Sequence, residues 1–110
     1  MKKYNESEIF TEVSLMSSEL RSSIKQMNRY YRYDVGDEIR RTLREIKYIL
    51  SDIHRNPNNC YKSDLLEKLD HLEIALNDCI EDGALSLTGR YNIVLPMERL
   101  SKIINLAEDL

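Results

Sequence analysis

The chain has 110 residues, a length that fits one domain, and 42% of them are hydrophobic. Charged residues make up 32%, and there are only three Gly and two Pro, which argues against a turn-rich β fold and against a disordered chain. The formal net charge of −3 argues against a protein that is basic over its whole surface, such as a general nucleic-acid binder.

Charge is nevertheless distributed unevenly along the chain. Ten Lys and Arg residues and five acidic residues lie between Arg21 and Lys62, which gives this segment a net charge of +5 and leaves −8 for the remainder. Two interpretations are open at this point. The segments can be ordinary solvated helix faces of mixed sign, or one face can be positive within an acidic protein.

Apolar residues recur at spacings of three and four in four stretches, the pattern of amphipathic helices. The first expected helix spans residues 6–31, with a stripe from Ile9 to Tyr31 and no Gly or Pro. The second spans residues 36–55, with Asp34 as the candidate N-cap. It ends before Asn56 and Pro57, because a proline disfavours helical geometry in the residue that precedes it.

The third expected helix spans residues 63–82 and ends at Gly83, which can adopt the left-handed conformation of a helix C-terminus. The fourth spans residues 87–110, with Ser86 or Thr88 at its start. An interior proline removes a backbone hydrogen bond at a cost of about 3 kcal/mol, so we expect this helix to be kinked or split near Pro96.

Short connections between these stretches favour antiparallel neighbours. The sequence therefore predicts an all-α fold, a single domain over residues 1–110 that forms an up-down-up-down antiparallel four-helix bundle. The sequence contains neither a signal peptide nor an apolar membrane span, so we expect a cytoplasmic location with two free thiols, a buried Cys79 and a loop Cys60.

A recognisable catalytic or metal-binding pattern is missing from the sequence. The three glycines are isolated from one another, so they do not form a phosphate-binding loop. His54 and His71 lack the Glu three residues before them that a di-metal bundle requires, and they have no ligand-spaced partners. We therefore expect a protein that is not an enzyme and has no metal or cofactor.

Basic residues recur at helical spacing on the first two expected helices, and we call each set a ladder. The first ladder is Arg21, Lys25, Arg29 and Arg32, and the second is Arg40, Arg44, Lys47 and Arg55, with Arg41 beside it at another angle. Antiparallel packing of these helices would join the ladders into a ridge suited to phosphates or to an acidic protein surface. The candidate nucleic-acid or partner-binding residues are Arg21, Lys25, Arg29, Arg32, Arg40, Arg41, Arg44, Lys47 and Arg55.

Three tyrosines, Tyr30, Tyr31 and Tyr33, lie at the end of the first ladder. Tyrosines beside arginine serve base stacking in RNA recognition, and they equally occur at bundle ends and oligomer interfaces, so they are candidates for an oligomer interface. The other three tyrosines considered are expected to be half-buried with the hydroxyl in water: Tyr48, Tyr61 and Tyr91.

The segment from Arg32 to Arg40 (Arg-Tyr-Asp-Val-Gly-Asp-Glu-Ile-Arg) resembles a bacterial family of four-helix bundles. This family contains the accessory variability determinant proteins of diversity-generating retroelements and the intervening-sequence proteins of large-subunit ribosomal RNA genes. The Leu-Glu-Lys-Leu segment that ends at Leu69 and the spacing from Ser86 to Tyr91 also fit its pattern. The chain departs from the pattern in its acidic net charge and in Pro96.

The resemblance implies a non-enzymatic accessory protein of a bacterial or phage retroelement. Such a protein would be a homopentamer that binds the reverse transcriptase and the template RNA for mutagenic retrohoming, with the basic ladders as the candidate contacts. Two alternatives stay open. One is an intervening-sequence-type bundle with a structural role, and the other is an unrelated helical protein–protein interaction module.

Overall fold

All four apolar stretches form long helices in the computed structural model, which describes residues 4–110. A fifth, short helix follows the first, and no strand occurs within that described range. The helices are α1 (Glu6–Gln26), α2 (Arg29–Tyr33), α3 (Val35–Arg55), α4 (Lys62–Glu81) and α5 (Leu87–Leu106). The predicted all-α class with four packed helices is confirmed.

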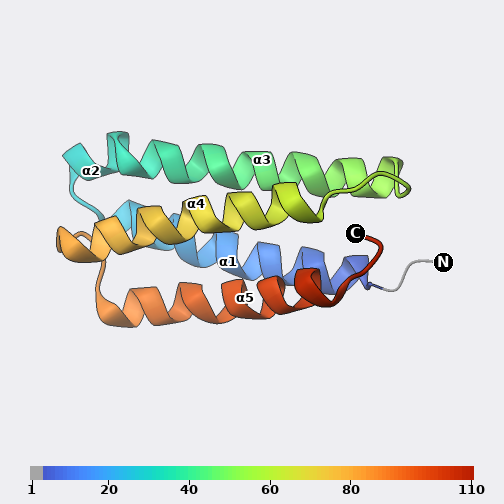
Figure 1. Cartoon of the computed structure of the whole chain (residues 1–110). Helices are drawn as coiled ribbons and strands as arrows, with labels where there is room; N and C mark the ends of the chain where they lie inside the picture. The colour runs from blue at the N-terminus through green and yellow to red at the C-terminus, as the bar shows by residue number, and fades with distance from the viewer. Residues whose placement is uncertain (1–3) are drawn as a thin grey trace.

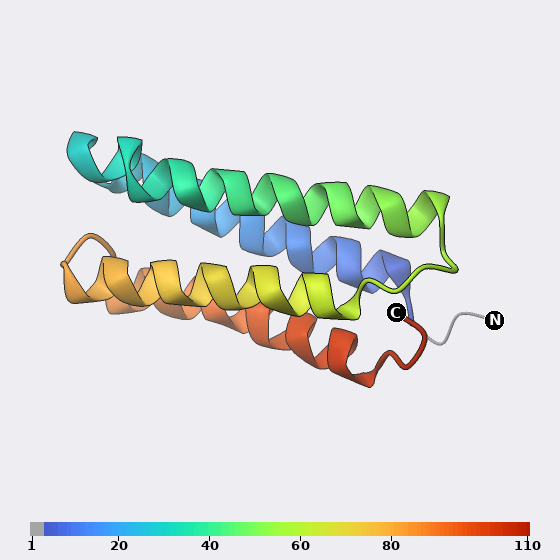
Figure 2. The same cartoon turned by 45° about the horizontal axis from the view of Figure 1, so that its top comes forward.

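Each long helix packs against two others: α1 and α4 both contact α3 and α5. The four lie side by side, and α1 begins at the end of the bundle where the C-terminus lies (Figures 1 and 2). Their apolar stripes meet in one core, because side chains three and four residues apart share a helix face. The largest fully buried side chains are Ile9, Met16, Leu20, Ile24, Ile39, Leu43, Ile46, Ile53, Leu65, Leu72, Leu76 and Ile93.

The first helix is shorter than predicted, because α1 ends at Gln26 and not at residue 31. Met27 adopts an extended conformation, and the side chain of Asn28 accepts a hydrogen bond of 3.0 Å from the backbone N–H of Tyr31. Asparagine is among the best N-cap residues, so it starts α2 as a separate helix. The apolar stripe continues across the break, since Met27 remains buried, and the stripe therefore gave no sign of it.

Helices α3 and α4 begin and end within one residue of the predicted ranges. Asp34 occupies the N-cap position of α3, but its side chain makes no capping hydrogen bond. At the end of α4, Gly83 has a φ of 73°, the N–H of Ala84 donates to the carbonyl of Cys79, and the N–H of Gly83 donates to that of Ile80. This pair of bonds is a Schellman motif, as expected for a glycine after a helix.

Helix α5 runs without a break from Leu87 to Leu106, and Pro96 lies inside it. Of the two predicted alternatives, a kink or a split near Pro96, the split is therefore wrong. It begins as predicted, with the Ser86 hydroxyl accepting a hydrogen bond of 3.0 Å from the N–H of Gly89. It ends four residues earlier than predicted, and the carbonyl of Leu110 accepts hydrogen bonds from the N–H groups of Tyr61 and Lys62 at the start of α4.

Among the described residues, two of the four contacts between long helices carry an ion pair of a Lys or Arg side chain with a carboxylate. Between α3 and α4, the Nζ of Lys68 lies 3.0 Å from a carboxylate oxygen of Glu45. Between α1 and α5, the Nε of Arg99 lies 3.0 Å from a carboxylate oxygen of Glu12. The α1–α3 side differs, and it holds the hollows described next. None of the described helices has the length and apolar character needed to cross a membrane.

Candidate functional site: a basic groove between α1 and α3

A hollow of about 520 Å³ between α1 and α3 brings part of both predicted ladders together. Arg21 and Lys25 reach it from α1, and Lys47 reaches it from α3. The remaining lining consists of serines of α1, which offer hydroxyl donors beside the cations: Ser14, Ser17, Ser18 and Ser22. We call this hollow the basic groove.

The cations of the basic groove lack acidic partners. Among the described residues, none of Arg21, Lys25 and Lys47 forms an ion pair with a carboxylate, although the neighbouring contacts of α3 and α1 contain such pairs. The pKa of Lys47 is lowered from its ordinary value of 10.5 by desolvation and by the positive charge of Arg21. Two like charges therefore face each other across the groove, an arrangement that an anion would relieve.

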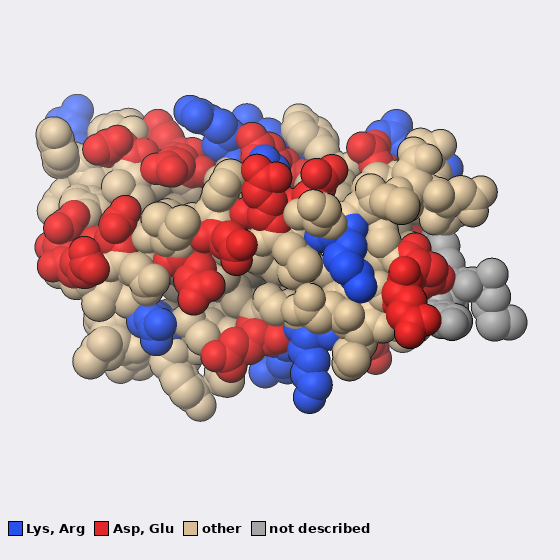
Figure 3. Space-filling view, in the orientation of Figure 1, with Lys and Arg blue, Asp and Glu red and all other residues tan. Residues whose placement is uncertain are grey.

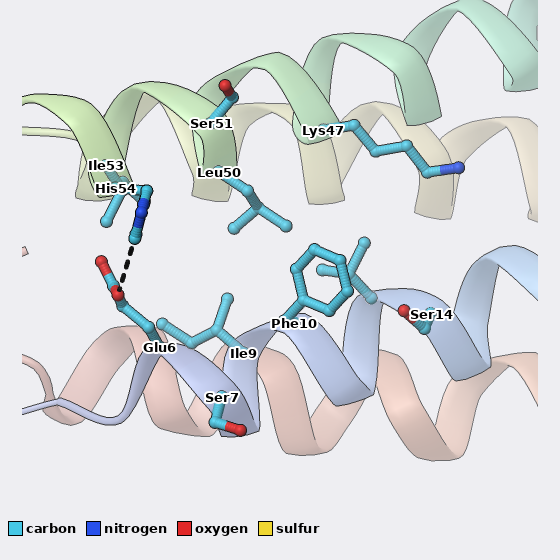
Figure 4. Close-up of a pocket in the computed structure, with 11 residues that line it drawn as sticks. Glu6, Ser7, Ile9, Phe10, Ser14, Lys47, Leu50, Ser51, Ile53 and His54 are labelled. Atoms are coloured by element: carbon cyan, nitrogen blue, oxygen red, sulfur yellow. Dashed lines mark ion pairs between the residues drawn. The ribbon is translucent and has the colours of Figure 1, made fainter.

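A second hollow of about 800 Å³ continues the basic groove toward the start of α1. Ser14 and Lys47 line both hollows. Phe10 from α1 and Leu50 from α3 point into the space between the two helices (Figure 4). The rest of its lining includes Ile9, Val13 and Ile53, so this part is mainly apolar, and we call it the apolar groove.

The far end of the apolar groove is marked by a contact between the two helices. The Nδ1 of His54 lies 3.7 Å from a carboxylate oxygen of Glu6, and this contact is an ion pair when the imidazole is protonated (Figure 4). His54 is 82% exposed at its side chain, so the contact lies at the surface. The groove therefore runs from an ionisable pair, over an apolar stretch, to a cationic and serine-lined stretch.

The other predicted basic residues on α3 lie outside the basic groove. Arg40 pairs with Asp37 at 3.0 Å, and Arg55 pairs with Asp52 at 3.0 Å, both within α3. Arg41 and Arg44 are exposed, without an ion pair in the described part of the chain. Arg40, Arg44 and Lys47 share one flank of α3 by helical spacing. Arg44 therefore extends the cationic flank beyond the groove, while the charge of Arg40 is paired with Asp37.

Arg29 and Arg32 belong to α2 and not to the first helix, which is a correction to the predicted ladder. The guanidinium of Arg32 donates 3.2 Å hydrogen bonds to the carbonyls of Lys25 and Met27, so it joins α2 to the end of α1. The guanidinium of Arg29 lies 5.9 Å from the centre of the Tyr33 ring, within the range of a cation–π contact.

The predicted tyrosine cluster divides into exposed and bonded members. Tyr30 is 81% exposed and Tyr33 is 66% exposed. The hydroxyl of Tyr31 donates to the carboxylate of Asp82 at the end of α4, and this bond raises the pKa of Tyr31 to about 12. Tyr31 therefore links α2 to α4 within the chain, and the two exposed tyrosines remain candidates for an interface.

The expectation of three half-buried tyrosines is wrong for each. Tyr48 and Tyr91 are 64% and 62% exposed. Tyr61 is buried, and its hydroxyl donates toward the backbone carbonyls of Asp52 and Asn56 at 3.0 and 2.8 Å. Tyr61 precedes the first residue of α4, so the apolar periodicity within that helix could not indicate its burial.

Cys79 is buried and Cys60 is exposed, as the sequence predicts, and both are free thiols. Burial raises the pKa of the Cys79 thiol to about 11, so it stays protonated and unreactive near neutral pH. The described residues contain no group of three or more His, Cys, Asp or Glu side chains placed to hold a metal ion.

Helix α4, which contributes no residue to the basic groove, is the most acidic of the described helices. This helix carries six acidic residues and two basic ones. Acidic side chains outnumber basic ones on the face that α4 presents in Figure 3. Net acidity and a local cationic groove therefore coexist, because α4 carries a surplus of acidic side chains while none of the residues that line the basic groove is acidic.

Sequence reasoning missed the serines and Phe10 as site residues. The serines occupy positions 14, 17, 18 and 22, on the same flank of α1 as Arg21 and Lys25, and this spacing was a usable signal. Phe10 is the only phenylalanine and stands beside the stripe residue Ile9. Comparison of the chain with protein-family models, curated proteins and solved structures gives no match.

Proposed function

We propose that this protein is a non-enzymatic adaptor that binds RNA through the basic groove. The observation that carries the proposal is the convergence of Arg21, Lys25 and Lys47 in a serine-lined hollow without a carboxylate partner. Uncompensated cations and hydroxyl donors are the groups that contact phosphates. The acidic face of α4 repels a polyanion and would direct it to the α1–α3 side of the molecule.

Within this proposal, the resemblance of the Arg32–Arg40 segment supports a place among the accessory proteins of diversity-generating retroelements. The protein then acts in the bacterial cytoplasm, binds the reverse transcriptase and its template RNA, and assembles as a homopentamer. Exposed Tyr30 and Tyr33 are the proposed contribution of α2 to that assembly. The proposed course of the long helices is up-down-up-down, with a bend of α5 at Pro96, and the shared end of α1 and the C-terminus supports this order (Figure 1).

The test is RNA binding by fluorescence anisotropy at two salt concentrations. A labelled single-stranded RNA of mixed sequence is titrated with the unaltered protein and with the Arg21→Glu/Lys47→Glu variant. We expect affinity that falls with salt, and a shallower dependence with much weaker binding for the variant. The matched control is Arg90→Glu/Lys102→Glu, which makes the same change of charge on α5 and should bind more tightly than the groove variant.

Absence of salt-dependent binding, or equal loss in the two double variants, would contradict RNA recognition by the groove. The wider assignment has separate tests. A reverse transcriptase gene beside a variable repeat would support the retroelement role, and a location inside a ribosomal RNA gene would support the intervening-sequence alternative. A monomer by light scattering would contradict the pentamer.

A second candidate function, a helical protein–protein interaction module, is favoured by the exposed apolar residues. Leu87, Ile74 and Leu106 are each more than 60% exposed, on α4 and α5. Large exposed apolar side chains often mark surfaces that a partner covers. Co-purification of a stoichiometric protein partner, lost when Leu87→Ser is combined with Ile74→Ser, would support this function over RNA binding.

A further inference from the structure

The apolar groove is a feature that phosphate contacts do not explain. Phe10 is the only phenylalanine in the chain and is 64% exposed at the mouth of this hollow. Leu50, which belongs to the buried stripe of α3, is only half-buried because it faces the same space. The volume of about 800 Å³ lies in the range of roughly 300–1,000 Å³ that is usual for small-molecule pockets.

The apolar groove and the basic groove form one continuous site. Ser14 of α1 and Lys47 of α3 line both, so an apolar ligand body in the first would place its end beside the cations of the second. In Figure 4 the side chain of Lys47 extends along α3 on the side of Ser14, while Phe10 and Leu50 lie toward His54. The site therefore has an apolar half and a cationic half in a fixed order.

The length of the apolar half sets the size of a ligand. Lys47 and His54 are seven residues apart on α3, which corresponds to roughly 10 Å along a helix axis. The contact between His54 and Glu6 lies at the far end, so a long chain would have to pass over it. An apolar body of this length corresponds to an alkyl chain of medium length.

From this geometry we propose that the α1–α3 groove binds an anionic amphiphile, with a carboxylate or phosphate head group and a medium-length alkyl chain. The head group accepts hydrogen bonds from Lys47 and Arg21, and the chain lies against Phe10, Leu50 and Ile9. Charge complementarity identifies this occupant. A neutral apolar ligand would leave the repulsion between Lys47 and Arg21 uncompensated, and a free phosphate would leave the apolar half empty.

This proposal goes beyond RNA binding, because it needs the apolar half that phosphates do not use. The two proposals share Lys47 and Arg21, so an amphiphile held at these residues competes with RNA for the same positive charge. The lowered pKa of Lys47 agrees with a site that gains stability when an anion enters it.

The experiment is titration of the full chain, labelled for NMR, with decanoate, decyl phosphate, decanol and inorganic phosphate below any micelle concentration. We expect saturable binding of one decanoate or decyl phosphate per chain, with shifts confined to α1 and α3. Decanol and inorganic phosphate should each bind about tenfold more weakly or not at all, because each fills only half of the site.

Variants distinguish this site from adsorption to the surface. Phe10→Ala and Lys47→Gln should each weaken decanoate binding by about tenfold. The controls are Tyr91→Ala and Lys102→Gln, since these residues are also exposed but lie on α5 outside the groove, and they should leave the affinity unchanged.

A blocking variant covers the case in which Phe10→Ala disturbs folding. Ser14→Trp places a large side chain where the two halves join, at an exposed position of α1, and should abolish binding. Equal affinity for decanoate and decanol, several ligands per chain, or unchanged affinity in the groove variants would each overturn the proposal. RNA binding that survives saturating decanoate would overturn the competition alone.

Discussion

The charged side chains of helix α3 have different surroundings on the sides that face its two long neighbours, α4 and α1. Toward α4, Glu45 forms a 3.0 Å ion pair with Lys68, and a hydrogen bond from this pair raises the pKa of Lys68. Toward α1, two residues further along, Lys47 faces Arg21, and desolvation with this like charge lowers the pKa of Lys47. One side is closed by complementary charge, and the other is an open groove whose described cations have no carboxylate partner.

The difference teaches how one small bundle can separate stability from binding. The core stripes are continuous under both sides of α3, so the groove does not require a hole in the core. What differs is the flank, where short serines, an exposed Phe10 and unpaired cations replace interlocking partners. A flank can change in this way at little cost, because solvated charges contribute little to folding.

The largest effect should separate the core from the groove. Ile46, on α3, has no exposed surface, so Ile46→Ala should lower the free energy of unfolding by about 2–5 kcal/mol through lost burial and the cavity left behind. Phe10→Ala, in the open groove, should change it by less than about 0.5 kcal/mol. Urea denaturation of both variants measures the contrast, and a comparable loss in the two would show that the groove is part of the stabilising core.

The core was predictable from sequence because the stripes of α1, α3 and α4 have helical spacing and no competing signal. The stripe of α5 was less clear. Tyr91 was expected to be half-buried but is exposed, while Ile93 and Met97 are buried. Tyr91 and Val94 lie at a helical spacing, as do Ile93 and Met97, so apolar spacing alone does not show which of the two pairs faces the core.

The site was predictable only in part, because the sequence gives the flank of a residue and not the width of the space beside it. Arg21, Lys25 and Lys47 were expected to meet if α1 and α3 were neighbours, and the structure brings them together. Arg32 has the same spacing but turns to the backbone of α1, since the break at Asn28 moves it to another helix. The apolar groove follows from how far two helices are separated, a property of the whole bundle.

A smaller effect should appear at the α3–α4 connection, on the closed side. Tyr61→Phe removes a hydroxyl that donates to the carbonyls of Asp52 and Asn56 in a part-buried position. We expect a loss of about 1 kcal/mol in the free energy of unfolding. Tyr48→Phe on the exposed face of α3 is the control and should have no measurable effect in the same denaturation experiment. Equal values for both would mean that this connection is not held by the Tyr61 hydroxyl.

A still smaller effect should come from giving the groove the complementary charge that the closed side has. Lys47→Glu places a carboxylate opposite Arg21, so it should raise the free energy of unfolding by about 0.2–1 kcal/mol. The same variant should abolish binding of RNA and of decanoate. Thermal unfolding at low salt measures the gain, and it should shrink at high salt because the pair is exposed. A loss of stability instead would show that the positive charge of Lys47 supports the fold.

The smallest effect is a pH dependence of opposite sign for the two lysines on the two sides of α3. The lowered pKa of Lys47 means that the folded state holds this proton less tightly than the unfolded chain does, so stability rises as the pH rises toward 10.5. The raised pKa of Lys68 means that its contribution is complete below 10.5 and is lost as the pH rises above that value.

The measurement is the difference in unfolding free energy between the unaltered protein and each of Lys47→Met and Lys68→Met, followed from neutral to alkaline pH. Other titrating groups are common to the proteins compared, so each difference isolates one lysine. As the pH rises, the free energy of unfolding of the unaltered protein should increase relative to that of Lys47→Met and decrease relative to that of Lys68→Met. Differences that move in the same direction would contradict the contrast between the two sides, because a closed ion pair and an open cationic groove require opposite slopes.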